Sequence, residues 1–194
     1  MSFFSKLLDS AVPALRSVLR SRAAAVRHRP PDPASASIRA TPTHRKREST
    51  QPAESPGRSG PDRTVEVDPE SIGPVRMSYC PITDGDPDPG EIVWTWVPYE
   101  ENNGQGKDRP VLVVAAETGG TVLVVQLTSK DHDGESDFAP VGAGDWDSSH
   151  RKSWANLERV LRVHPSGMRR EAAALPETPF QTVADRLRSR YGWN

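Results

Sequence analysis

The chain has 194 residues, 19 of them prolines, with 35% hydrophobic residues and a mean hydropathy of -0.64, which excludes one evenly packed domain over its full length. Its net charge of -1 conceals an asymmetry, because residues 1–62 carry 11 Lys/Arg and 5 Asp/Glu whereas the remaining residues carry 14 and 21. A basic arm ahead of an acidic body is typical of a tail that attracts phosphates or anionic lipids, and a solvated linker is the alternative interpretation.

The first predicted element is a basic amphipathic helix over residues 1–27. Apolar residues recur there at three- and four-residue steps from Phe4 to Leu19, with lysine and arginine interspersed. Residues 2–27 are therefore a candidate for contact with a membrane surface or for docking on a partner. Pro13 lies inside the pattern, so a fraying terminus is the alternative.

Residues 28–75 follow as a predicted disordered linker. They are rich in Pro, Ser, Thr, Arg and Glu and contain almost no large apolar side chains, so burial cannot offset the entropy of ordering them. The pattern changes after this stretch, and a folded domain is predicted over residues 76–194. Its first residues, 76–89, form a transition in which Met77, Tyr79 and Ile82 are available for packing.

Three β-strands are predicted at the start of the folded domain. Residues 91–97 alternate and are rich in β-branched and aromatic side chains, and residues 110–116 and 121–127 are continuous apolar runs. Gly119 and Gly120 lie between the last two runs and can adopt positive φ, which predicts a tight hairpin. The aromatic side chains assigned to the core are Trp94, Trp96, Trp146, Trp154 and Phe180.

The second half of the domain carries weaker strand signals and one helix. Residues 138–141 form a short strand signal inside a polar loop, and residues 153–163 read as two short strands or one bent strand. Thr178 is predicted to cap a helix, with Pro179 at its first position and Gln181 completing a capping box. The helix is expected to bury Phe180, Val183, Ala184 and Leu187. The predicted fold class is mainly β, a small barrel with a C-terminal helix packed against it.

Cys80 and the absence of long apolar segments indicate a cytoplasmic protein. Cys80 has no second cysteine to pair with and no Cys or His neighbour at zinc-ligand spacing, which favours a reducing compartment. No apolar run reaches the roughly eighteen residues of a membrane span. The apolar stretch over residues 3–19 is broken by charged side chains, so no signal peptide is expected.

The order of the strands and their end residues resembles the PemK/MazF toxin family over roughly residues 88–190. The most specific parts are residues 90–94 (Gly-Glu-Ile-Val-Trp) and residues 107–113 (Lys-Asp-Arg-Pro-Val-Leu-Val), and residues 153–160 are similar to the actinobacterial-type members. The resemblance implies a small SH3-like barrel of the PemK/CcdB type that forms a homodimer and is neutralised by an antitoxin protein. It also implies a metal-independent endoribonuclease that cuts single-stranded RNA, including mRNA, into a 2′,3′-cyclic phosphate and a 5′-hydroxyl end. No metal or cofactor is expected.

The same resemblance assigns the catalytic roles to Arg109 and Thr128. In that family the arginine and the threonine face the scissile phosphate, where a forked guanidinium binds two phosphate oxygens and a hydroxyl adds a third donor. Without the resemblance, Arg109 is interpreted as a member of a surface ion pair, and Thr128 as a residue that is common in strands because of its β-propensity. Two supporting candidates follow in the chain: Ser129, expected on the opposite strand face, and His132, a general acid or base or else a surface histidine.

Tyr99, Lys107 and Lys130 are the predicted RNA contacts, through base stacking for the tyrosine and through phosphate binding for the lysines. The charge of the domain opposes this role, because residues 90–194 carry 12 Lys/Arg and 15 Asp/Glu. The basic side chains would therefore have to gather on one face: Lys107, Arg109, Lys130, Arg151, Lys152, Arg159 and Arg162. An acidic loop over residues 131–137 lacks the pattern of a calcium loop and is predicted to be solvated.

Two other classes of function stay open. The same barrel fold would serve as a catalytically weak or inactive binding module, or as a DNA gyrase-type inhibitor that inserts an exposed basic and aromatic end, residues 186–193. Alternatively, the N-terminal helix is the active part and tethers an inert domain. Arg109 and Thr128 favour the enzyme.

Overall fold

The structure is a computed structural model that describes residues 54–194 apart from residues 83 and 102 and the side chains of residues 170–172. The predicted basic helix over residues 1–27 and the first part of the predicted linker, residues 28–53, lie outside the described residues. Within the described part of the chain, no helix is long and apolar enough to cross a bilayer.

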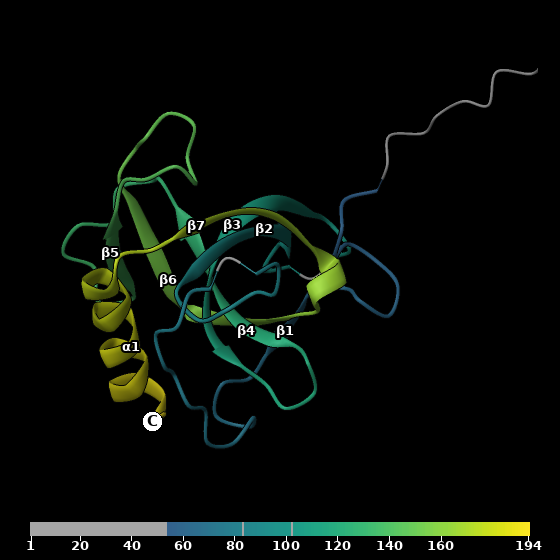
Figure 1. The fold of residues 1–194 in the computed structure, drawn as a ribbon, viewed down its shortest axis with the longest axis horizontal. Coiled ribbons are helices and arrows are strands. Elements are labelled where there is room, and N and C mark those ends of the chain that lie inside the picture. The colour runs from purple at the N-terminus through teal and green to yellow at the C-terminus, as the bar shows by residue number, and fades with distance from the viewer. Residues whose placement is uncertain (1–53, 83, 102) are drawn as a thin grey trace, which may run out of the picture. The chain divides into compact units, whose positions relative to one another are not determined.

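One antiparallel sheet with a C-terminal helix makes up the described fold (Figure 1). The strands are β1 Val65–Val67, β2 Glu91–Pro98, β3 Gly106–Ala116, β4 Val122–Thr128, β5 Phe138–Gly142, β6 Ser153–Val163 and β7 Met168–Ala174. A short 3-10 helix, η1 Pro165–Gly167, precedes β7, and α1 Glu177–Tyr191 follows it. The strand order is β1-β6-β4-β3-β2-β7, with β5 paired to β6. The predicted fold class, mainly β with a C-terminal helix, is confirmed.

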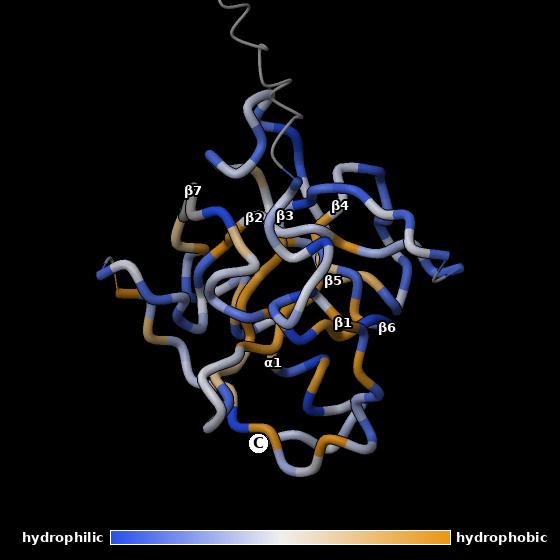
Figure 2. Tube along the Cα trace, turned by 90° about the vertical axis from the view of Figure 1, so that its right-hand side faces the viewer, coloured by the Kyte–Doolittle hydropathy of each residue, from blue (hydrophilic) through white to orange (hydrophobic). Residues whose placement is uncertain are grey.

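Both faces of the central strands are buried, as their continuous apolar runs predict. One face forms a cluster from β2, β3, β4, β6 and the start of β7: Val93, Val97, Val111, Val113, Val122, Val124, Leu161, Val163 and Met168. Figure 2 shows these strands as the hydrophobic centre of the molecule. Because distant strands of the sheet share this cluster, the sheet curls so that its valine face closes on itself as a small barrel.

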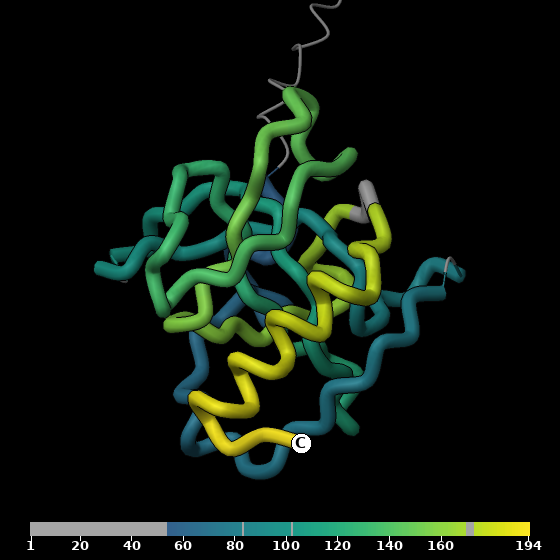
Figure 3. Tube along the Cα trace, turned by 90° about the vertical axis from the view of Figure 1, so that its left-hand side faces the viewer, coloured from purple at the N-terminus to yellow at the C-terminus, as the bar shows by residue number. Residues whose placement is uncertain are grey.

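The opposite face of the sheet packs against α1 (Figure 3). The helix buries Phe180, Val183, Ala184 and Leu187 against side chains such as Leu112 and Val125, as the sequence predicts. Successive residues of a strand point to opposite faces, so neighbours such as Val111 and Leu112 serve the two clusters in turn.

The predicted capping box of α1 is wrong. The cap residue is Pro176, without a side-chain cap bond, and Thr178 lies inside the first turn. The reason is tertiary: Leu175 is fully buried and its backbone N–H donates to Gly90 O at 2.8 Å, so the chain turns into the helix directly after that anchor. At the other end, Gly192 closes the helix with a φ of 68° and a bond from its N–H to Arg188 O.

Residues 54–77, called the strap below, correct the prediction of disorder over residues 54–75. Strand β1 pairs with the outer edge of β6, with Val65 opposite Arg162. Val75 and Met77 belong to the core, and their backbones exchange hydrogen bonds with the C-terminal residue Asn194. Disorder was predicted from the average composition of this stretch, in which a few apolar residues have little weight. Each of these residues nevertheless packs into a core that the rest of the domain forms.

Two predictions about aromatic residues are also corrected. Trp94 and Trp96 are half-buried rather than core, because β2 places Thr95 inward between them, and they stack under Arg169 and Arg58 at 5.8 and 4.9 Å. Trp193, predicted to be exposed, is 5% exposed, and its indole N–H donates to Pro69 O at 3.3 Å. The tryptophan of the C-terminal end is therefore packed into the fold and is not the exposed aromatic side chain that the gyrase-inhibitor alternative requires, whereas Arg186 and Arg190 of the same end are exposed.

The β3–β4 hairpin is tied to β6 by an ion pair between Glu117 and Arg162. The guanidinium donates from Nε and Nη2 to the two carboxylate oxygens at 2.6 and 2.7 Å, and Thr121 Oγ1 donates to Oε2 at 2.6 Å. The hydrogen bonds from Arg162 hold the pKa of Glu117 below its ordinary value, against the opposing effect of burial.

Replacing Glu117 by Gln should remove a pH-dependent part of the stability. A carboxyl whose pKa is depressed on folding stabilises the fold above its unfolded pKa of about 4.3, and this contribution is lost as the pH falls through the lower folded pKa. Because both side chains are partly exposed, the difference in unfolding free energy at pH 7 is expected to be below about 1 kcal/mol. Urea unfolding at pH 7 and pH 3 measures it. Glu70→Gln, at an exposed position, is the control, and a Glu117→Gln difference that does not shrink at acid pH would contradict the prediction.

Candidate active site

Arg109 and Thr128 lie side by side on the two central strands. Arg109 pairs with Thr95 of β2, and on its other side the pairing of β3 with β4 ends at Val111 and Gln126, two residues from Arg109 and from Thr128. Thr128 is the last residue of β4 and pairs with Trp154 of β6. The structure thus brings together the two residues that the sequence predicted as a pair.

The two residues line one cavity of about 440 Å³, called the Arg109–Thr128 cavity below. Its walls come from the start of β3, the end of β4 and the loop between β5 and β6, with Trp94 of β2 beside them. That loop is anchored by Trp146, whose indole N–H donates to Ser153 Oγ at 3.2 Å. The cavity volume falls in the range of small-molecule and nucleotide sites.

Arg109 has an unused buried hydrogen-bond donor in this cavity, where Asp108 Oδ1 is an unused buried acceptor. The Nε of Arg109 is buried and has no hydrogen-bond partner, and no carboxylate of the described residues forms an ion pair with it. A buried donor without a partner costs about 1–3 kcal/mol. An anionic ligand that accepts from this guanidinium would recover that cost, so the site is suited to a phosphate oxygen.

Two of the three carboxylates that line the cavity with Arg109 are paired with other arginines. Asp147 accepts from Arg151 at 2.7 Å, and this hydrogen bond lowers the pKa of Asp147. Asp108 pairs with Arg169 at 3.2 Å. Lys107 also lines the cavity and forms no ion pair within the described residues. Asp145 also lines the cavity, and its exposed carboxylate lies 3.8 Å from His150 Nδ1. Two of the three carboxylates that line the cavity are therefore paired with arginines, and the third has no arginine partner within the described residues.

The hydroxyl groups at the end of β4 face the same cavity. Thr128 Oγ1 accepts from the backbone N–H of Lys130 at 3.2 Å, which leaves its own O–H proton available to a ligand. Ser129 lines the cavity as well, one residue beyond the end of β4. The side chain of Lys130 is exposed and does not line the cavity.

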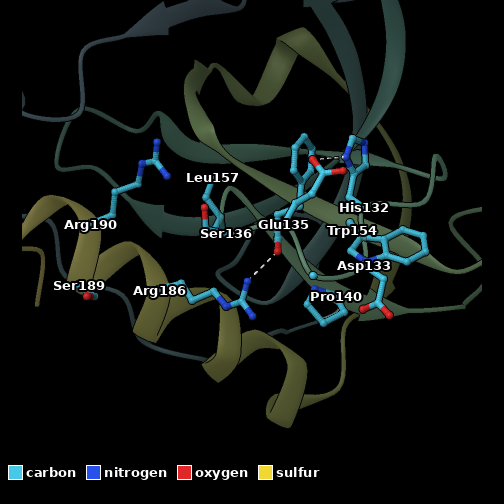
Figure 4. A pocket seen from close by; sticks show the side chains of 12 residues that line it. His132, Asp133, Glu135, Ser136, Pro140, Trp154, Leu157, Arg186, Ser189 and Arg190 are labelled. Atoms are coloured by element: carbon cyan, nitrogen blue, oxygen red, sulfur yellow. Dashed lines mark hydrogen bonds and ion pairs between the residues drawn. The ribbon is translucent and has the colours of Figure 1, made fainter.

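His132 lies in a different place. It stacks on Phe138 with ring centroids 3.5 Å apart, and its Nδ1 is 3.0 Å from Glu135 Oε2. His132 and Glu135 line a separate cavity of about 590 Å³ against α1. Figure 4 shows these two side chains next to one another, with Arg186 and Arg190 on the helix side of the cavity. The structure therefore does not bring His132 to Arg109 and Thr128.

The acidic loop over residues 131–137 is not purely solvated. Asp137 pairs with Arg190 of α1, and Glu135 pairs with His132. The first of these contacts ties the loop to the helix. The sequence shows Asp137 only as part of a local acidic run, because its partner Arg190 is distant in the chain.

Tyr99 lies in a third cavity of about 350 Å³, called the Tyr99 cavity below. Arg109 lines it too, together with Pro98, Glu100, Glu101, Gln126 and Arg159. Gln126 was missed by the sequence analysis, although it lies two residues before Thr128 and therefore shares its strand face. Arg159 is not free, since it donates to Glu66 at 2.6 and 3.0 Å and to Pro98 O at 3.1 Å.

Comparison with known proteins relates this site to a family. The family model for PemK-like, MazF-like toxins of type II toxin-antitoxin systems matches residues 88–190. Similar solved chains come from two MazE-MazF crystal structures of Deinococcus radiodurans. The Form-II chain is 21% identical with a TM-score of 0.40, over 55% of this chain and 96% of that one. The Form-III chain is 19% identical with a TM-score of 0.40, over 56% and 99%.

The toxin MazF-mt6 of Mycobacterium tuberculosis is also similar, at 15% identity and a TM-score of 0.38, over 53% of this chain and 98% of that one. Among curated protein sequences, none matches the chain. The match to the family model includes the Arg109–Thr128 cavity and α1, and it begins after the strap.

Proposed function

This chain belongs to the PemK-like, MazF-like toxins of type II toxin-antitoxin systems, and on that premise we propose that it is an endoribonuclease that cuts single-stranded RNA without a metal ion. The observation that carries the proposal is the buried, unpartnered Nε of Arg109 beside the Thr128 hydroxyl in one cavity. A toxin of this kind acts on cytoplasmic RNA.

The proposed reaction is attack by a ribose 2′-oxygen on the adjacent phosphorus. The O2′–P bond forms and the P–O5′ bond breaks, which gives a 2′,3′-cyclic phosphate, while the proton lost from the 2′-hydroxyl is balanced by one gained at the 5′-oxygen. Negative charge builds on the non-bridging oxygens, where the Arg109 guanidinium supplies a forked pair of donors and Thr128 supplies a hydroxyl. Preorganised donors of this kind are among the largest contributions to enzymatic rate enhancement.

The residues of the cavity favour charge stabilisation over strong base catalysis. Of the three carboxylates that line the cavity, Asp108 and Asp147 are each paired with an arginine, and Asp145 is exposed to solvent. The hydrogen bond from Arg151 lowers the pKa of Asp147. A lowered pKa makes a carboxylate a weaker base. The proposed mechanism therefore assigns most of the acceleration to Arg109 and Thr128.

An antitoxin protein and a second copy of the chain are the proposed protein partners. Membership of a type II toxin family supports the antitoxin. We propose a homodimer on the same ground, and size-exclusion chromatography with light scattering measures it directly.

The proposed activity predicts how the RNA ends will look. The full chain, incubated with a long single-stranded RNA in excess EDTA, should make discrete cuts that leave 5′-hydroxyl and 2′,3′-cyclic phosphate ends. The same RNA with every 2′-hydroxyl methylated should stay intact, because the attacking group is blocked. Ends carrying a 5′-phosphate would contradict the mechanism, and intact RNA in the presence of a folded protein would contradict the enzyme.

A further inference from the structure

The strap builds a cavity of its own beside those already described. Its volume is about 410 Å³. The lining residues from the strap are Arg58, Arg63, Thr64, Val65 and Glu66, and those from the body of the domain are Trp96, Pro98, Gly104 and Gln105. We call it the strap cavity. The strap residues precede the segment matched by the family model, so this cavity is an addition to the family core.

Three cavities of the domain are connected through shared lining residues. Pro98 lines both the strap cavity and the Tyr99 cavity, and Arg109 lines both the Tyr99 cavity and the Arg109–Thr128 cavity. Arg159 lines the Tyr99 cavity and donates to two residues of the strap cavity, to Glu66 and to Pro98 O. These shared residues link the strap to Arg109 through a series of three cavities, called the track below.

The cations of the strap cavity are open to a new anionic partner. Arg58 lies 4.9 Å over the Trp96 ring, and its ion pair with Glu54 is long, at 3.5 Å, with both side chains about half exposed. Such a pair contributes little and is readily exchanged. Arg63 is exposed and forms no ion pair within the described residues. Glu66, the carboxylate in the lining, is held by Arg159.

The middle of the track has the opposite character. Glu100 and Glu101 line the Tyr99 cavity with exposed carboxylates, beside the phenol of Tyr99 and the amide of Gln126. Carboxylates repel a phosphate but accept hydrogen bonds from the amino groups of bases. Cations line the strap cavity and the Arg109–Thr128 cavity, and hydrogen-bond acceptors line the Tyr99 cavity between them. This order suits a single RNA strand whose phosphates lie in the two outer cavities and whose bases face the middle one.

We propose that the strap cavity is an additional subsite for the single-stranded RNA substrate, in which Arg58 and Arg63 bind phosphates at a distance from the cleaved bond. Trp96 holds the Arg58 guanidinium in place, and a planar guanidinium also offers a surface on which a base stacks. Basic and aromatic side chains interleaved along a groove are the usual means of binding a single strand. The subsite rests on the proposed function, since it serves the strand that Arg109 cleaves.

The test measures binding separately from cleavage. The probe is a fluorescent single strand of fully 2′-O-methylated RNA, which lacks the free 2′-hydroxyl and therefore stays intact. The full chain is compared with Arg63→Ala, Arg58→Ala/Arg63→Ala, and Arg76→Ala. Arg76 is the matched control, because it is an exposed strap arginine that lines none of the three cavities.

For each phosphate of a single strand that a variant no longer neutralises, the slope of log K against log salt should flatten by about 0.7. The slope of the double variant is thus expected to be flatter by about 1.4, with binding roughly tenfold weaker at moderate salt, and the slope of the single variant should change by half as much. Arg76→Ala should match the unsubstituted chain in both quantities. Equal thermal unfolding midpoints will show that the variants keep their fold.

Three results would overturn the subsite: an unchanged slope in the double variant, an equal flattening in Arg76→Ala, or no binding of the probe by the unsubstituted chain. A failure of the proposed function looks different. If the unsubstituted chain leaves unmodified RNA intact while the slope of the double variant is still flatter, the ribonuclease is contradicted and the strap is retained as a binding site for single strands.

Discussion

Arg109→Ala is expected to lower the single-turnover rate of RNA cleavage by about a hundredfold to a thousandfold without unfolding the domain. The side chain is half-buried and has no carboxylate partner within the described residues, so its removal breaks no ion pair and leaves no charge uncompensated. What it removes is the forked donor for the charge that develops on the phosphate. The measurement is a single-turnover time course on a defined RNA, with the unfolding midpoint recorded beside it.

Two further variants sharpen the test of Arg109. Arg109→Lys keeps the charge but loses the planar fork, so it should recover only a small part of the lost rate. Arg151 is a second cation of the same cavity, and it is already paired with Asp147. Arg151→Ala should therefore lower the cleavage rate far less than Arg109→Ala does. If Arg151→Ala proves as damaging as Arg109→Ala, the cavity needs its overall charge rather than a positioned guanidinium, and the assignment of Arg109 fails.

The strands were predictable where their side chains carry a periodic signal. Strands β2 and β4 lie almost where the alternating and continuous apolar runs placed them, whereas β3 begins at Gly106, before the apolar run does. The bent-strand alternative for residues 153–163 is correct, because β6 is one strand whose pairing with β4 shifts register between Val125 and Leu127. Strand β7 was missed, since its residues include no β-branched or aromatic side chain and its pairing with β2 makes it a strand.

The site was predictable only in part. The proximity of Arg109 and Thr128 follows only in part from the hairpin, because the register of β3 and β4 shifts by one residue at the irregularity between Val113 and Ala115. The state of the surrounding charges does not follow from the sequence, because Arg159 meets Glu66 across 93 residues of chain and Arg190 meets Asp137 across 53. His132 is close to Thr128 in the sequence yet separated from it in space, because its ring stacks on Phe138. Charge counts therefore overestimated the free negative charge of a cavity in which two of the three carboxylates are paired with arginines.

A fragment of residues 76–194 is expected to be far less stable than a fragment of residues 54–194. Removing residues 54–75 deprives Arg159 of its two hydrogen bonds to Glu66, and a hydrogen bond to a charged group contributes about 1.5–3 kcal/mol. It also removes Val75 from the core, worth about 1.5–3 kcal/mol, and uncovers the edge of β6. Since a domain is stable by only about 5–15 kcal/mol, much of the shorter fragment should be unfolded at 25 °C. Urea unfolding followed by tryptophan fluorescence measures the difference.

The cause of that loss is separable within the longer fragment. Glu66→Gln keeps the strap and removes the negative charge, so it should reproduce much of the cost of the unpaired Arg159. Glu66→Leu/Arg159→Met replaces the pair by apolar side chains and should restore most of the stability, because no buried charge is left without a partner. If the fragment of residues 76–194 unfolds at the same urea concentration as that of residues 54–194, the strap is dispensable for folding. The domain would then begin at residue 76, and the strap would act only in binding the RNA strand.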